Sequence, residues 1–141
     1  MPEVNSEQRI VPYLLYSDAP AAIDFLCRAF GFTEQFRLPM PDGRVGHAQL
    51  AYEGDLVMLA SAFSEGGFAS PLNLPAVHSL VYCTVDDADA HYARARVAGA
   101  TIAAEPANEH GTRMYRALDT EGHRWLFAGP VPEGQETTDH E

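Results

Sequence analysis

The apolar residues of the chain predict strands and helices in a regular order. Residues 10–16 are mostly apolar and begin the first predicted strand. Ser17, Asp18 and Pro20 come next, and these residue types favour the N-cap and first turn of a helix. An apolar stripe with helical spacing follows, and Gly31 ends the predicted helix because glycine tolerates the left-handed conformation found there.

Three extended segments follow this helix, at 32–38, 45–52 and 56–60, and turn residues separate them. Residues 61–77 are rich in Ser, Gly and Pro without a period, so we expect a long connection there. The second half then predicts a strand at 78–85, a helix between Asp86 and Gly99, an extended piece at 101–104, a loop at 105–111, and strands at 112–118 and 124–128.

The two halves repeat at an offset of 68 residues, which relates Asp18 to Asp86, Gly31 to Gly99, and Gly54 to Gly122. A helix covers one face of each predicted sheet, and the other face needs a partner. The sequence therefore predicts an α+β fold of two tandem βαβββ modules, with curved mixed sheets around a central cleft and helices on the outside. We expect a single domain with module one at about 10–60, a connecting loop at 61–77, module two at about 78–130, and tails at 1–9 and 131–141.

Composition narrows the possible functions. The chain has 141 residues, 46% of them hydrophobic, which predicts a globular domain. Its formal net charge of −11 opposes binding to nucleic acid and to anionic membranes, and it favours a cationic ligand. Cys27 and Cys83 lie in apolar segments and are expected to be free thiols, as in a reducing compartment. Neither a secretory signal nor a membrane-spanning run is visible, so we expect a cytoplasmic protein.

Several short motifs carry a family resemblance. They are Val11-Pro12-Tyr13-Leu14, Asp42-Gly43-Arg44, His47-Ala48, Val85-Asp86-Asp87-Ala88 and Gly122-His123-Arg124-Trp125. Together they resemble the vicinal oxygen chelate superfamily, which includes glyoxalase I, extradiol dioxygenases, fosfomycin resistance enzymes and bleomycin resistance proteins. The chain is most similar to the PhnB-like glyoxalase/bleomycin-resistance group, over roughly residues 10–130. Such a likeness is specific for a fold and weak for any one activity.

The resemblance implies where a metal site would lie. Members that use a metal take ligands from the first and last strands of each module, and these positions fall on Val11, Met58, Leu80 and Leu126. All four side chains lack the nitrogen or charged oxygen donors that divalent metals require. We therefore expect neither a metal nor another cofactor. Only a register shift of two residues would recruit a ligand, His78.

The same pattern suggests a ligand-binding cleft. Period-two alternation places His47 beside Gln49, and the offset of 68 makes Tyr115 the equivalent of His47, with Arg113 one step along. His47 would suit acid–base chemistry near neutral pH. An exposed strand face or simple core packing are the alternatives, and His91, on the second helix, is expected to be exposed. The predicted cleft residues are Tyr13, His47, Gln49, Met58, Tyr82, Arg113, Tyr115, Arg124 and Leu126, and no catalytic residue is assigned.

Two main functions remain open at this point. The first is a metal-free binder of a small molecule or drug in the cleft between the modules. The second is a metal-dependent lyase, isomerase or dioxygenase with a non-standard site. A module that serves only for interaction is a third possibility, and it predicts a filled cleft. The resemblance also implies a homodimer.

Overall fold

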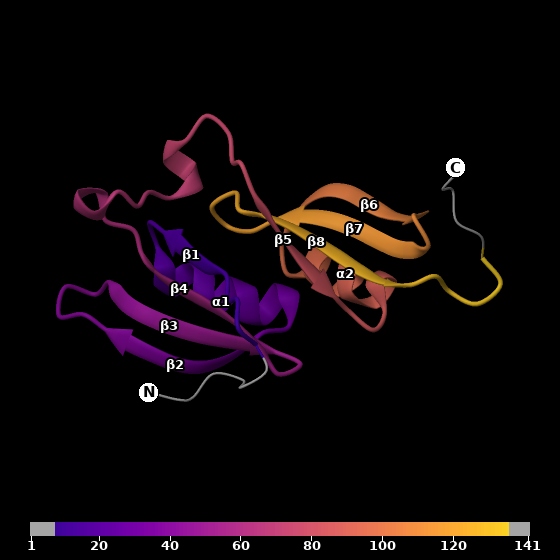
Figure 1. Ribbon diagram of the computed structural model, residues 1–141, viewed down its shortest axis with the longest axis horizontal. Helices are drawn as coiled ribbons and strands as arrows, with labels where there is room; N and C mark the ends of the chain where they lie inside the picture. Colours follow the sequence, from indigo (N-terminus) through magenta and orange to yellow (C-terminus); the bar gives the residue numbers. More distant parts are fainter. Residues whose placement is uncertain (1–7, 136–141) are drawn as a thin grey trace.

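The computed structural model describes residues 8–135, which form two modules joined by a connector (Figure 1). Module one contains β1 (Tyr13–Tyr16), α1 (Ala19–Phe30), β2 (Thr33–Pro39), β3 (Val45–Tyr52) and β4 (Asp55–Ser61). Module two contains β5 (Leu80–Thr84), α2 (Ala88–Val97), β6 (Thr101–Glu109), β7 (Thr112–Leu118) and β8 (Arg124–Pro130). Two short 3-10 helices lie in the connector, η1 (Ser64–Gly66) and η2 (Pro71–Asn73).

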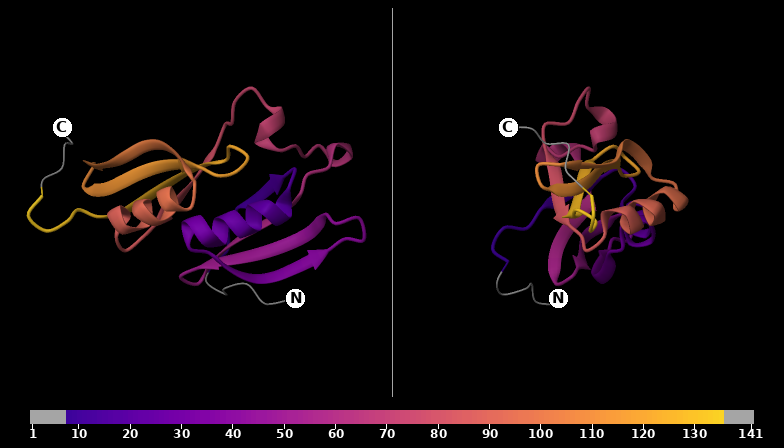
Figure 2. Two further views of the ribbon diagram at one scale, coloured as in Figure 1. Left: turned by 180° about the vertical axis from the view of Figure 1, so that it is seen from behind. Right: turned by 90° about the vertical axis from the view of Figure 1, so that its right-hand side faces the viewer.

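Each module builds a mixed sheet of four strands, in the order β1-β4-β3-β2 and β5-β8-β7-β6. The β1–β4 and β5–β8 pairs are parallel, and the remaining pairs are antiparallel. This topology confirms the α+β prediction of two βαβββ modules. Seen from behind, the molecule shows both helices on the near side (Figure 2). Each sheet therefore has a helix-covered face and an opposite face, which we call the open face.

The helix-covered faces share one core across both modules. Phe30, at the end of α1, packs against two rings of β8, with centroid distances of 5.3 Å to Trp125 and 4.8 Å to Phe127. Phe32 also contacts Trp125, at 5.6 Å. All four side chains are at most 5% exposed. The two modules therefore share one hydrophobic core. Aromatic burial of this size contributes strongly to stability.

The C-terminal ends of the two helices also bond to each other. The Arg28 guanidinium donates to the Ala98 carbonyl at 3.0 Å, and Arg94 donates to the carbonyls of Arg28 and Cys27 at 3.1 and 3.2 Å. Carbonyls at a helix C-terminus have no partner within the helix, and a cation nearby favours the helix dipole. Each arginine thus satisfies the end of the neighbouring helix.

The loop between β7 and β8 docks onto module one through two buried carboxylates. Glu121 is 5% exposed, and its carboxylate accepts hydrogen bonds from the backbone N–H groups of Ser17 and Asp18, both at 2.7 Å. The Ser70 hydroxyl of the connector donates to the same carboxylate. Because these donors precede helix α1, the negative charge lies at the favourable end of the helix dipole.

Asp119 anchors the other end of this loop. It is 6% exposed and accepts from the Tyr16 hydroxyl at 2.5 Å and from the Trp125 indole N–H at 3.0 Å. Its second oxygen accepts from the backbone N–H groups of Glu121 and His123, both at 3.1 Å. Burial, followed by the charge of Asp119, raises the pKa of Tyr16 well above its usual value, so the phenol remains a donor.

Most predicted boundaries agree with the structure. The Asp18 side chain caps α1 by accepting from the Ala21 N–H, and Gly31 ends the helix with φ 85°, as predicted. The predicted loop at 105–111 is wrong, because β6 continues to Glu109. Irregular pairing between Ile102 and Ala107 accommodates the proline of this segment, which cannot donate to a regular ladder. The predicted tails fall largely outside the described residues.

The buried loop carboxylate makes the first prediction. Glu121→Ala removes the acceptor of two backbone N–H groups and one hydroxyl, and we expect the free energy of unfolding to fall by about 3 kcal/mol. Urea denaturation measures this change. Glu65→Ala, at an exposed position of the connector, is the matched control and should change stability by less than about 0.5 kcal/mol. Equal effects of the two substitutions would show that the Glu121 bonds do not hold the modules together.

Candidate functional site

The open face of module one carries four of the predicted cleft residues. Tyr13, Met58 and Gln49 lie side by side, because Met58 pairs with both of the others in the sheet register. The Tyr13 hydroxyl lies 2.8 Å from Nδ1 of His47. The Phe36 ring lies 6.1 Å from that of His47. This face therefore combines one imidazole with an apolar and aromatic surface.

Gln49 is the unusual residue of this face. It is 0% exposed, and neither its amide nitrogen nor its amide oxygen has a hydrogen-bond partner within the described part of the chain, residues 8–135. His47 Nε2 is likewise buried and unpartnered. Leaving such groups unpaired costs about 1–3 kcal/mol each. Polar atoms of this kind mark a place where side chains rearrange or where a ligand completes the bonding.

The open face of module two carries three more predicted residues. Tyr82 and Leu126 pair across β5 and β8, and Arg124 follows in phase on β8. Tyr82 is 57% exposed, whereas Leu126 is 7% exposed. Arg116, which sequence reasoning missed, shares this face because it pairs with Leu126 across β7 and β8. The face is thus apolar with two arginines.

Arg113 and Tyr115, which were predicted to line the cleft, lie instead on the helix-covered face. Arg113 forms a salt bridge with Asp89 of α2 at 3.0 Å. Tyr115 is 1% exposed and belongs to the hydrophobic core. Its hydroxyl lies 2.6 Å from Nδ1 of His91. Both side chains stabilise the packing of α2 on the sheet.

A difference of one residue between the modules explains why Arg113 and Tyr115 lie on the helix-covered face and not in the cleft. Gln49 pairs with Met58, nine positions later, whereas Arg116 pairs with Leu126, ten positions later. The β7–β8 connection therefore holds one residue more than the repeat predicts. Because side chains alternate between faces, a slip of one residue moves Tyr115 from the open face to the core.

His91 was expected to be exposed, but it is only 9% exposed and lies in the core. Its Nε2 lies 2.9 Å from the Phe30 carbonyl of α1, so this imidazole links the two modules. Burial is the main cause that lowers the pKa of His91 below its usual 6.5. The neutral ring therefore bridges the Phe30 carbonyl and the Tyr115 hydroxyl.

A groove of about 510 Å³ lies where the modules meet. Tyr82 is the predicted cleft residue that lines it. Its walls come from the segment before β1, the β3–β4 hairpin, β5 and β8, and its lining residues are Gln8, Ile10, Pro12, Phe32, Tyr52, Glu53, Asp55, Leu56, Val57, Val81, Tyr82, Cys83, Thr84 and Trp125. Among the described residues, the lining contains two acidic side chains, Glu53 and Asp55, and no basic one. Its volume lies within the usual range of small-molecule sites.

Cys83, in this groove, is unsuited to nucleophilic chemistry. Burial, together with the charge of Asp55, raises the pKa of its thiol to about 11. The thiol therefore remains protonated near neutral pH, whereas the thiolate is the reactive form. Both cysteines of the chain are free. The groove thus offers surface for binding and lacks an activated nucleophile.

The residues present do not suit the metal that the family resemblance implies. Met58 and Leu126 lie on the open faces without a metal-binding donor, and Leu80 opposes Arg124. Val11 precedes β1, and His78 is exposed in the segment before β5. Within residues 8–135, no three His, Cys, Asp or Glu side chains gather closely enough to hold a metal ion. The metal-free character of the site stays a prediction.

The comparison with protein families identifies this fold. The sequence model of the "Glyoxalase/Bleomycin resistance protein/Dioxygenase superfamily" matches residues 9–127. The chain belongs to this superfamily. The resemblance drawn from the sequence motifs is thereby confirmed. None of the described helices is long and apolar enough to cross a membrane.

Several individual proteins are similar to this chain over most of its length. Protein Rv0887c of Mycobacterium tuberculosis is 36% identical over 134 residues, which cover 92% of this chain and 79% of that protein. The crystal structure of TioX from Micromonospora sp. ML1 has a TM-score of 0.70 and 32% identity, and covers 88% of this chain and 99% of TioX. The PhnB protein of Bacillus cereus shares the fold, with a TM-score of 0.63 and 15% identity, over 86% of this chain and 98% of its own.

The buried histidine makes the second prediction. The unfolded chain protonates His91 as the pH falls through about 6.5, whereas the folded protein resists protonation because its pKa is lower. Stability is therefore full above pH 6.5 and declines as the pH falls below it, towards and through the folded pKa. His91→Gln should lower stability at pH 7.5 and remove this decline, so the gap between wild type and variant narrows on acidification.

Urea denaturation of both proteins between pH 7.5 and 5.5 measures that gap. His78→Gln, at an exposed position before β5, provides the control. A gap that stays constant across this range would contradict the assigned role of His91.

Proposed function

We propose that this protein binds a small aromatic molecule in the groove between its modules, without a metal. The groove itself carries the proposal, since it offers about 510 Å³ beside a tyrosine, Tyr82, that is 57% exposed. Tyr52 also lines it, and Phe32 and Trp125 form its floor from the shared core. Aromatic walls with a few polar groups are the usual form of a small-molecule site.

A cationic or neutral ligand suits the charges of this groove. Glu53 and Asp55 contribute carboxylates to the lining, and no arginine is among the lining residues. A cation over a tyrosine face gains about 0.5–2 kcal/mol from the ring quadrupole. The net charge of −11 favours approach of a cation as well.

Metal-dependent catalysis is the alternative, and it has less support. The strand positions that the resemblance offers as ligands hold apolar side chains, and the acidic residues of the groove have no histidine among their groove neighbours. The Cys83 thiol is protonated near neutral pH. Binding alone requires none of these groups.

We further infer that the protein acts in the cytoplasm.

The third prediction tests binding with thioflavin T, a cationic aromatic dye whose fluorescence rises when it is held rigidly. Wild type should bind it, and Tyr82→Ser should weaken binding about tenfold because stacking is lost. Asp55→Asn should weaken it about threefold and reduce its dependence on salt. Fluorescence titration measures both effects.

Val97→Ser is the matched control, because Val97 is 89% exposed on α2, away from the groove. It should leave the affinity within about twofold of wild type. Absence of dye binding by wild type would overturn the proposal. So would stoichiometric Zn, Ni, Mn or Fe in purified protein that a chelator removes together with an enzymatic activity.

We also propose a homodimer, and this is the fourth prediction. Leu80 and Tyr82 on the edge strand β5 are 51% and 57% exposed, and an exposed edge with apolar side chains favours pairing with another chain. Leu80→Asp should shift the protein towards monomer in sedimentation equilibrium. The matched change Val97→Asp should not, and a wild-type monomer at all concentrations would contradict the proposal.

A further inference from the structure

Two arginines stand on the open face of module two without an acidic partner. Arg116 of β7 pairs with Leu126 in the sheet register, and Arg124 of β8 pairs with Leu118. The two arginines are therefore diagonal neighbours on adjacent strands, about 7–8 Å apart. Both are exposed, and within residues 8–135 neither forms a hydrogen bond or a salt bridge. Their long side chains can converge on one group.

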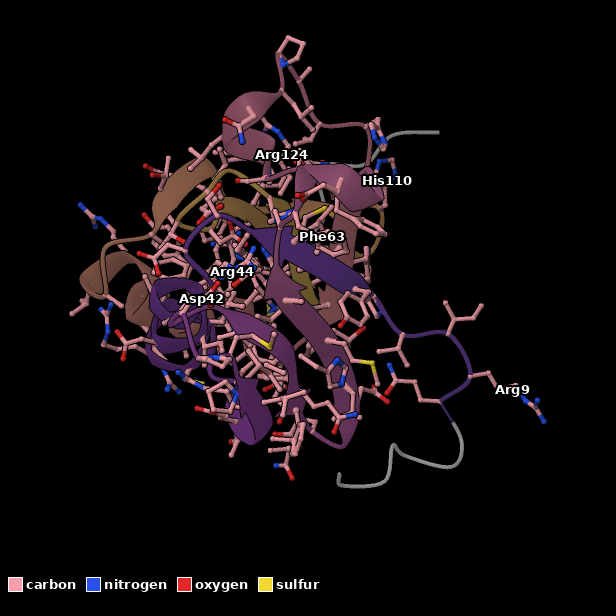
Figure 3. The ribbon with its side chains drawn as sticks, turned by 90° about the vertical axis from the view of Figure 1, so that its left-hand side faces the viewer. Arg9, Asp42, Arg44, Phe63, His110 and Arg124 are labelled. Carbon is pink, nitrogen blue, oxygen red and sulfur yellow. The ribbon has the colours of Figure 1, made fainter. Side chains whose placement is uncertain are left out.

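The chain offers many carboxylates that could pair with these two arginines. Acidic residues outnumber basic ones, 20 to 9, so partners are plentiful. Within the part of the chain that the structure describes, four arginines of other surfaces form salt bridges with nearby carboxylates, namely Arg28, Arg37, Arg44 and Arg113. Arg44 and its partner Asp42 lie together in Figure 3. The same view shows Arg9 extending away from the molecule, whereas Arg124 lies within its outline.

The surroundings of the two arginines are apolar. Met114, Leu126 and Ala128 form a small buried cluster on this face, and Tyr82 stands beside it, paired with Leu126. The β6 neighbour of Arg116 is Ala104. The next residue, Glu105, is exposed in the irregular stretch before Ala107 and forms no salt bridge with Arg116 among the described residues. Glu109 of β6 opposes Thr112, four residues along β7 from Arg116, which is roughly 13 Å away. A guanidinium beside apolar surface interacts more strongly with an anion than one in open water.

The open face of module one has no arginine at the positions that correspond to Arg116 and Arg124. By strand pairing, Gln49 takes the place of Arg116, and Leu56 takes the place of Arg124. The positive charge is thus a property of module two alone. Gln49 and Arg116 are polar residues at the same position of the two open faces, and this shared placement supports a role of the position in recognition.

We propose that Arg116 and Arg124 form a recognition site for a small apolar molecule that carries an anionic oxygen group, such as a carboxylate or sulfonate. The guanidinium groups bind the oxygens through charge-assisted hydrogen bonds, for which arginine geometry is suited. The apolar part of the ligand lies against Leu80, which opposes Arg124 across β5 and β8 and is 51% exposed. This site adjoins the groove at Tyr82, which lines the groove and pairs with Leu126, but the groove lining is acidic and includes neither arginine.

A matched pair of dyes tests the site as the fifth prediction. The anionic dye 8-anilinonaphthalene-1-sulfonate and its neutral counterpart N-phenyl-1-naphthylamine differ only in the sulfonate, and both fluoresce on apolar surfaces. The double variant Arg116→Gln/Arg124→Gln should weaken binding of the anionic dye at least about tenfold. It should leave the neutral dye within about twofold. The double variant Arg9→Gln/Arg96→Gln removes the same charge elsewhere and should leave both affinities unchanged.

Three results would overturn this site. They are unchanged affinity of the anionic dye in the Arg116/Arg124 variant, an equal loss in the Arg9/Arg96 control, and an equal loss for both dyes. Dissociation of a dimer by the Arg116/Arg124 variant without loss of dye binding would also overturn it, since acidic groups of a second copy would then be the true partner. Thioflavin T binding in the groove should not respond to these arginines, so each site fails or stands independently.

Discussion

The structure depends most on the burial of Glu121 and Asp119 where the β7–β8 loop meets module one. Moving a carboxylate out of water is costly, and among residues 8–135 no cation pairs with either group, so the hydrogen bonds of these residues must offset the cost. Glu121 takes its donors from the start of α1 and from the connector. Asp119 takes its donors from Tyr16 and Trp125. This single loop therefore ties both modules and the connector together, and it fixes the two walls of the groove relative to each other.

Local signals in the sequence predicted the elements well. Asp18 and Gly31 end their helix as such residue types should, because capping depends on groups only a few positions away. The role of Glu121 could not be predicted in this way. Its donors on Ser17 and Asp18 lie more than a hundred residues away in the chain, and an acidic residue in a turn is ordinarily a solvated one.

The candidate site was predicted in part, and the errors have one cause. A repeat with a constant offset makes Tyr115 the equivalent of His47, but strand pairing makes Arg116 the equivalent of Gln49. One additional residue in the β7–β8 connection reverses the faces of β7 relative to the offset. The same connection contains Glu121, so the residue that breaks the repeat belongs to the segment that joins the modules. Sequence periodicity could not reveal this, because it carries no information on register between strands.

The charges of the molecule show why net charge is a poor guide to a site. The chain carries −11 overall, and the groove follows that sign through Glu53 and Asp55. The open face of module two has the opposite sign, through Arg116 and Arg124. Screening in salt limits surface charges to about 8–10 Å, so the local pair dominates at contact while the net charge acts only at a distance. A ligand with an anionic oxygen group at one end and an aromatic body would be repelled by the groove and held on the sheet. The two surfaces of one small domain thus carry charges of opposite sign.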